Sequence, residues 1–187
     1  MASQPQNPRF VRRISIVCCN FVRNVAYYRT GYVSEDGNGR LKQPTEFGAT
    51  VNGNMLDIAV LEWCKLFADR KARHHWHRLI KDETERKQFS AQLHQAAQVT
   101  DQGWAKYVDL IRIYRDKFVA HLDDEDAMPA PLPLDIALKS AFFLYAYICA
   151  NAPPGTLDMP RYRKLPDDLP AYYAECQRVA QHAYIPA

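Results

Sequence analysis

The positions of the prolines limit the fold of this chain more than any other feature of its sequence. Twelve prolines occur, at 5, 8, 44, 129, 131, 133, 153, 154, 160, 166, 170 and 186, and none lies between Thr45 and Met128. Proline lacks the backbone N–H and clashes with the preceding turn inside a helix, so the proline-free block favours helices. No useful stretch alternates apolar and polar residues as a half-buried strand does. The sequence therefore predicts an all-α fold, an up-and-down bundle of about five to six helices.

Hydrophobic spacing and helix-end residues predict six helices. Their expected ranges are about 10–30, 54–67, 84–99, 101–121, 136–152 and 169–184. Gly31 is expected to stop the first helix, Asn54 to cap the second and Asp101 to cap the fourth. These helices imply three regions: a flexible N-terminus over 1–9, a bundle over 10–152, and a C-terminal loop and helix over 153–187 packed on the bundle. The polar loop expected at 33–53 is long for a compact domain, which is typical of a mobile or functional segment.

An arginine interrupts the apolar face of the fourth predicted helix. On a helical wheel, Arg115 falls in the middle of an apolar stripe and His121 lies at its edge. The stripe consists of Trp104, Val108, Ile111, Phe118 and Leu122. A guanidinium in a dry interior costs several kcal/mol unless it is paired. Arg115 is therefore expected either to pair with an acid of another helix, such as Asp57 or Glu62, or to face a cleft or subunit interface where an anion binds.

This arginine and histidine form a recognisable motif. The segment RDKFVAH, from Arg115 to His121, resembles the R-x(4–6)-H motif of HEPN domains, in which the residue after the arginine is commonly Asn, Asp or His. Two further segments, LDIAVLEWCKLFAD at 56–69 and HHWHRLI at 74–80, resemble the second helix and the following segment of abortive-infection-type HEPN proteins. The resemblance covers roughly Leu56 to Ile148.

The resemblance implies an α-helical bundle that forms a homodimer, with the two motifs lining a cleft at the interface. Many such proteins are metal-independent endoribonucleases of toxin–antitoxin, phage-defence or RNA-processing systems, and others are inactive binding or scaffolding modules. Carried over, the motif residues of this chain are Arg115, Asp116 and His121. We therefore expect an endoribonuclease that acts on RNA without a metal or other cofactor, with a cognate antitoxin as a candidate partner. The alternative is an inactive interaction or RNA-binding module of the same fold.

The residue types of the motif fit RNA cleavage without a metal. Such cleavage uses the RNA 2′-hydroxyl as its nucleophile, and a histidine, with an ordinary pKa of about 6.5, can take that proton at neutral pH. The planar guanidinium of Arg115 can bridge two phosphate oxygens as their charge grows. Asp116 is expected to orient Arg115 or His121, more readily across a dimer than within one helix.

Several basic and aromatic residues are candidate RNA contacts, through phosphate binding and base stacking. They are Arg73, His74, Trp76, Arg78, Arg112 and Lys117. The alternative for Trp76 is a tryptophan that packs on the core at a solvated helix end. A second basic segment, RYRK at 161–164, is expected to be solvated. His74 and His77 share a face but have no evident third ligand, so no metal site is expected.

The acidic run from Asp123 to Asp126 directly follows the motif and does not fit it well. Acids at a helix C-terminus oppose the helix dipole, and they repel RNA. The run is expected to be a solvated turn that ends the helix. The alternatives are an electrostatic gate, a binding segment for a basic partner, or a metal site with His121.

The remaining features point to an ordinary soluble protein. The net charge is +3, and the five cysteines include no C-x-x-C pair, which favours a reducing compartment. The most apolar run, at 141–150, is too short to span a bilayer, and no secretory signal is evident. We therefore expect a cytoplasmic protein with no membrane partner. The sequence contains no glycine-rich phosphate loop, which argues against nucleotide-dependent motors.

Overall fold

The computed structural model describes residues 7–32, 45–120 and 132–184, and within these ranges all regular structure is helical. The α-helices are α1 (Pro8–Tyr32), α2 (Glu46–Trp63), α3 (Glu83–Ala97), α4 (Asp101–Tyr114), α5 (Asp135–Asn151) and α6 (Leu169–Tyr184). Two π-helical segments, η1 (Cys64–Ala68) and η3 (Arg115–Ala120), continue α2 and α4, and η2 (Trp76–Arg78) is a short 3₁₀ helix. The expected all-α bundle is confirmed.

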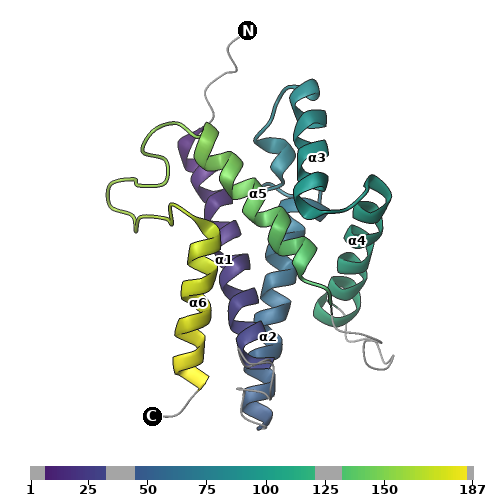
Figure 1. Cartoon of the computed structure of the whole chain (residues 1–187), viewed down its shortest axis with the longest axis vertical. Coiled ribbons are helices and arrows are strands. Elements are labelled where there is room, and N and C mark those ends of the chain that lie inside the picture. The colour runs from purple at the N-terminus through teal and green to yellow at the C-terminus, as the bar shows by residue number, and fades with distance from the viewer. Residues whose placement is uncertain (1–6, 33–44, 121–131, 185–187) are drawn as a thin grey trace.

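Helix α1 is the centre of the bundle. It packs along α2 and along α6, and Figure 1 shows these three helices lying lengthwise, with α2 antiparallel to α1. Helix α5 runs diagonally across them, and α3 and α4 lie on the side away from α6 (Figure 1). Helix α3 packs on α5, and the C-terminal parts of α2 and α4 meet through η1 and η3.

Side-chain caps determine where most of these helices begin. A side-chain oxygen of the residue before the helix accepts a hydrogen bond from a backbone N–H in the first turn, which would otherwise be unsatisfied. The capping residues are Asn7, Thr45, Asp82, Thr100 and Asp168. The expected caps were wrong in two places, because Asn54 lies inside α2 and Asp101 is the first residue of α4. Helix α1 begins at Pro8, so it includes the end of the segment expected to be flexible.

Helix α2 begins earlier than expected because tertiary contacts support its first turns. Residues 46–53, expected to belong to a loop, are helical. Asn52 is fully buried there, and its Nδ2 donates hydrogen bonds to the Tyr28 carbonyl at 3.1 Å and to the Tyr184 hydroxyl at 3.3 Å. These contacts join α2 to α1 and α6, and they outweigh the low helix propensity of the glycines in this segment.

Gly31 allows the close approach of these three helices. It lies inside α1 rather than stopping it. A Cβ atom at this position would lie 2.3 Å from Asn52 Nδ2 and 2.8 Å from the Tyr184 hydroxyl oxygen. Gly31 is thus required by packing and not by helix termination.

Trp63, the last residue of α2, connects three helices inside the core. Its indole Nε1–H donates a hydrogen bond of 2.9 Å to Ser140 Oγ on α5, and both residues are buried. Its ring contacts three other aromatic rings with centroid distances of 5.3–5.7 Å, those of Phe67, Trp104 and Tyr107. Helix α4 is thereby held against the end of α2, where both helices change to π-helical geometry.

Candidate functional site

Two π-helical segments lie next to each other in this fold. Segment η1 ends α2, segment η3 ends α4, and the residues at these ends contact one another. π-Helical turns are rare and occur frequently at functional sites. The candidate motif begins at the first residue of η3, Arg115.

Two arginines join the end of η1 to the start of η3. Arg112, in the last turn of α4, donates a hydrogen bond from Nη2 to the carbonyl oxygen of Ala68, the last residue of η1. Arg115 Nη1 lies 2.5 Å from the Oδ1 of Asp69, the residue that follows η1. The carbonyls at the end of a helix lack intrahelical partners, so Arg112 acts as a cap on η1 and Arg115 extends that junction by an ion pair.

Asp116 holds the same guanidinium from the other side. Arg115 Nε donates a hydrogen bond of 2.8 Å to Asp116 Oδ1. Asp116 therefore orients Arg115 within one chain, and a contact of Asp116 across a dimer stays a prediction. The two carboxylates fix the plane of the guanidinium, since they bind different nitrogens of its rigid fork.

The expected ion-pair partners of Arg115 were the wrong acids. Asp57 accepts a hydrogen bond of 2.7 Å from the Tyr114 hydroxyl, and Glu62 pairs with Lys65 at 3.0 Å. A helical wheel gives the face of its own helix on which Arg115 lies, but not which acid of another element lies opposite it, and that acid is Asp69. Arg115 itself keeps α-helical backbone angles, and the π-helical turn, which bonds residue i to i+5, shifts only the side chains that follow it.

The guanidinium of Arg115 stays charged at every physiological pH. Its hydrogen bond to Asp116 raises the Arg115 pKa further above the ordinary value, and Asp69 acts in the same direction, while burial opposes both. The Arg115 side chain is 20% exposed, so the charge is accessible from solvent and not enclosed in the core. Burial raises the pKa of the nearby Cys64 thiol to about 12, which rules it out as a thiolate nucleophile at neutral pH.

The other half of the motif lies outside the described residues. This applies to His121 and to the acidic run from Asp123 to Asp126. The backbone is described as far as Ala120. Of the three expected motif residues, Arg115 and Asp116 are in contact, and the position of His121 relative to them stays a prediction.

The segment after Asp69 places its aromatic residue in the core. Trp76 is 5% exposed, and its ring packs against Phe89 with a centroid distance of 4.6 Å. The expectation that Trp76 offers a face for base stacking is therefore wrong in this structure, and the alternative of core packing is correct. Its neighbours Arg73 and Arg78 are exposed, and His74 is half-buried with its pKa lowered by burial and by Arg73.

The remaining candidate RNA contacts, Arg112 and Lys117, are partly exposed. Arg112 is used to cap η1, as described above, so its guanidinium has a structural role. Lys117 lies in η3, two residues beyond Arg115.

Sequence reasoning missed three polar residues. Asp69 looked like one acid in a basic segment, yet it is the partner of Arg115. His75 is buried and neutral: its Nε2 faces the Phe67 carbonyl at 3.1 Å, and its Nδ1 accepts from the His77 N–H at 3.2 Å. Burial lowers the His75 pKa to about 4.

The third of these residues is Arg12, which is 6% exposed and binds backbone carbonyls of the segment after α5. The roles of Asp69 and Arg12 come from contacts between residues far apart in the chain, which no local sequence signal reveals.

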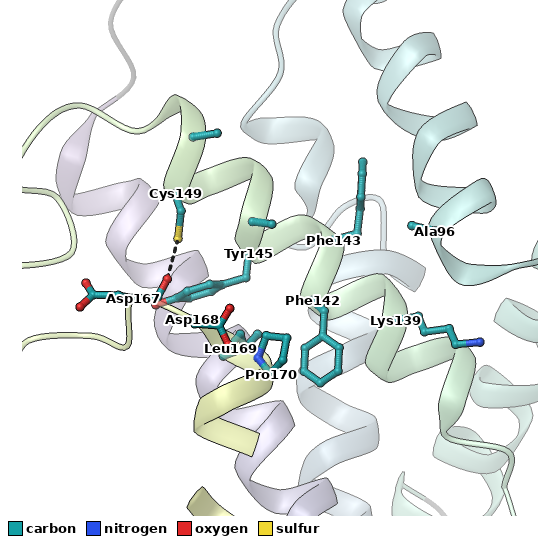
Figure 2. Close-up of a pocket in the computed structure, with 12 residues that line it drawn as sticks. Ala96, Lys139, Phe142, Phe143, Tyr145, Cys149, Asp167, Asp168, Leu169 and Pro170 are labelled. Carbon is teal, nitrogen blue, oxygen red and sulfur yellow. Dashed lines mark hydrogen bonds between the residues drawn. The ribbon is translucent and has the colours of Figure 1, made fainter. Parts of the chain in front are cut away.

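A cavity lined mainly by apolar side chains lies between α5 and the start of α6. Figure 2 shows Tyr145 and Cys149 of α5 on the side of Asp167, and the ring of Phe142 beside Pro170. Burial raises the pKa of the Cys149 thiol, and Asp168 caps α6. Within the described residues, no group of three His, Cys, Asp or Glu side chains is placed to hold a metal ion.

Comparisons with family models, curated proteins and solved structures found no significant match to this chain. The similarity to HEPN domains therefore rests on the motif and its surroundings alone. No helix in the described part of the chain is long and apolar enough to cross a bilayer.

Proposed function

We propose that this protein is a HEPN-type endoribonuclease that cleaves RNA without a metal ion and acts as a cytoplasmic homodimer. The observation that carries the proposal is the fixed, partly exposed guanidinium of Arg115, held by Asp69 and Asp116 at the start of a π-helical segment. Holding a cation in one orientation before the substrate binds is what transition-state stabilisation of a phosphate requires.

The proposed reaction is an attack by the RNA 2′-oxygen on the adjacent phosphorus. His121 takes the proton from the 2′-hydroxyl, the new 2′-oxygen–phosphorus bond forms, and the bond to the 5′-oxygen of the next nucleotide breaks. The leaving 5′-oxygen takes a proton from water, and the product ends in a 2′,3′-cyclic phosphate. Arg115 bridges the phosphate oxygens, using guanidinium donors beyond the two that its ion pairs engage.

A partly apolar surface beside the motif supports the proposed homodimer. Tyr114 and Asp57 hydrogen-bond across α4 and α2, and Leu110 and Leu61 lie one turn away from them on the same faces. These two leucines are 40% and 37% exposed. Exposed apolar side chains that gather on one face are typical of protein interfaces. A dimer through this face would bring the two Arg115 regions towards each other.

A second candidate function is a non-catalytic interaction module of the same fold. The Arg115–Asp69 ion pair favours this alternative, because it neutralises the arginine within one chain and so gives it a purely structural use. For both candidate functions, the resemblance to HEPN domains implies a toxin–antitoxin or phage-defence system, with a cognate antitoxin as the partner.

RNA cleavage in EDTA separates the two candidates. Purified wild-type protein is incubated with 5′-labelled RNA, beside the Arg115→Ala, Arg115→Lys and His121→Ala variants. The endoribonuclease predicts full cleavage by the wild type, none by Arg115→Ala or His121→Ala, and a small residual rate for Arg115→Lys, because a lysine keeps the charge and loses the fork. His182→Ala, an exposed histidine of α6, is the matched control. Intact RNA with the wild-type protein supports the interaction module.

A further inference from the structure

A basic groove lies on the side of the bundle away from α4. Helix α1, the segment after α5 and helix α6 enclose it, with a volume of about 810 Å³. Figure 1 shows this segment at the opposite side of the molecule from α4, so the groove is separate from the Arg115 region. Five basic and three acidic residues line it.

The acids of the groove are mostly engaged already. Asp167 pairs with Lys164 at 2.8 Å, and Asp168 caps α6. Capping leaves the charge of Asp168 in place, so the four arginines of the groove are opposed by two acids, Asp168 and Glu175. The arginines come from three elements: Arg12 and Arg23 from α1, Arg163 from the segment after α5, and Arg178 from α6. The groove keeps an excess of positive charge.

Arg12 contributes a buried charge to this groove. Its guanidinium donates hydrogen bonds to the backbone carbonyls of Thr156, Leu157 and Arg163. Among the described residues, the structure shows no carboxylate in ion-pair contact with it. Carbonyl dipoles satisfy the N–H donors of a buried guanidinium but leave its net charge in place, and an anion nearby offsets the cost of that charge.

An exposed aromatic ring stands beside these cations. Tyr162 is 64% exposed, and the Arg12 guanidinium lies 5.4 Å from its ring centroid. The preceding residue, Arg161, has a φ of 71°, a backbone conformation that residues other than glycine rarely adopt. Here a tight turn imposes it: the Tyr162 N–H donates a hydrogen bond of 3.1 Å to the Met159 carbonyl, with Pro160 and Arg161 as the two central residues. Tyr162 is thus held on the surface rather than folded into the core.

We propose that this groove binds a single-stranded segment of nucleic acid, with phosphates on Arg163 and Arg178 and a base stacked on Tyr162. Single-strand sites combine a positively charged groove with aromatic rings on which bases stack. An acidic peptide would use the same cations but would leave the exposed ring without a role, so the combination favours nucleic acid. The site lies apart from the proposed cleavage motif and needs no cleavage to be detected.

Binding to a strand that cannot be cleaved tests this proposal. The probe is a fluorescent 12-nucleotide RNA with 2′-O-methyl sugars, measured by anisotropy at several salt concentrations, because blocking the 2′-oxygen prevents the proposed reaction. The variants are Arg163→Gln with Arg178→Gln, and Tyr162→Leu. The matched controls are Arg161→Gln, an exposed neighbour outside the groove, and Tyr162→Phe, which keeps the ring. Replacing the Arg163 side chain leaves its carbonyl available to Arg12.

We expect the double variant to bind about fivefold or more weakly and its salt slope to fall by about 1.4, since each lost phosphate contact in a single strand removes about 0.7. Tyr162→Leu should weaken binding about fivefold or more through lost stacking, while both controls bind as the wild type does. Unchanged binding by the double variant or by Tyr162→Leu would overturn the proposal. So would displacement of the strand by an acidic peptide with the sequence LDDEDA, which is that of residues 122–127.

Discussion

Arg115 and Asp69 join the ends of two different helices, with Arg115 Nη1 2.5 Å from Asp69 Oδ1. The arginine is the first residue of η3, and the aspartate follows the last residue of η1. This ion pair makes the orientation of the motif arginine depend on a residue 46 positions earlier in the chain. The candidate site is therefore built from a helix junction and not from the R-x(4–6)-H segment alone.

Asp69→Asn should separate an orienting role of this carboxylate from a structural one. The side chains of Arg115 and Asp69 are partly exposed, and such ion pairs contribute less than about 1 kcal/mol to stability. We expect the free energy of unfolding in urea to fall by no more than that, while RNA cleavage falls roughly tenfold as the guanidinium loses its fixed position. Asp109→Asn, an exposed acid on α4, is the control. Normal cleavage by Asp69→Asn would argue against the orienting role.

Gly31→Ala should destabilise the protein by about 2 kcal/mol, because overpacking of this kind typically costs about 1–3 kcal/mol. The added Cβ would lie 2.3 Å from Asn52 Nδ2, so at least one hydrogen bond of Asn52 must shift. Gly53 provides the opposite case, since it lies inside α2 with nothing within 4 Å of an added Cβ. Gly53→Ala should stabilise by about 0.5–1 kcal/mol through helix propensity. Thermal unfolding of both variants measures the contrast, and equal effects would contradict the packing described for Gly31.

Ser140→Ala should cost about 1–3 kcal/mol, because it leaves the buried Trp63 indole N–H without its acceptor. Ser15→Ala is the matched control. Ser15 is equally buried, but its hydroxyl donates to the Val11 carbonyl of its own helix, so its loss removes no acceptor from a buried donor. We expect Ser15→Ala to change the urea midpoint little. A larger loss from Ser15→Ala than from Ser140→Ala would show that the Trp63 hydrogen bond does not stabilise the core.

The buried His75 should make stability depend on pH between about 6.5 and 4. Its folded pKa is about 4, below an ordinary value of about 6.5. In this window the unfolded chain binds a proton that the folded protein does not, so stability falls as pH falls. Complete protonation would cost roughly 3 kcal/mol, from about 1.4 kcal/mol per pKa unit. His75→Gln should lose less stability than the wild type between pH 7 and pH 4 in urea unfolding. His182→Gln should follow the wild type, and parallel curves for His75→Gln and the wild type would contradict the assignment.

The helical architecture could be predicted because its signals are local. The proline-free block, the apolar spacing and the residues at helix ends identify α3, α5 and α6 to within about two residues. The start of α2 could not be predicted, since Glu46–Gly53 looks like a polar loop and is helical because Asn52 contacts α1 and α6. The role of Gly31 could not be predicted either. A glycine near the end of a helix is typical of a helix stop, and the packing partners that require it lie on other elements.

The candidate site could be predicted only in part. Arg115 stood out because a charge interrupts an apolar pattern, and the neighbouring Asp116 followed from the motif. Asp69 was not predictable, because it lies 46 residues earlier in the chain and meets Arg115 only through the packing of η1 against the end of α4. Trp76 was ambiguous from sequence, since an aromatic residue among cations fits both RNA stacking and core packing, and its contact with Phe89 decides for the core.

The most direct test of the proposed function is the end group of RNA incubated with this protein in EDTA. The proposed reaction predicts fragments that end in a 2′,3′-cyclic phosphate, formed by the wild type and by His182→Ala but not by Arg115→Ala or His121→Ala. Circular dichroism should show the same helical signal for all four proteins. Intact RNA with the wild type, or the same cyclic-phosphate products from His121→Ala, would contradict the central claim.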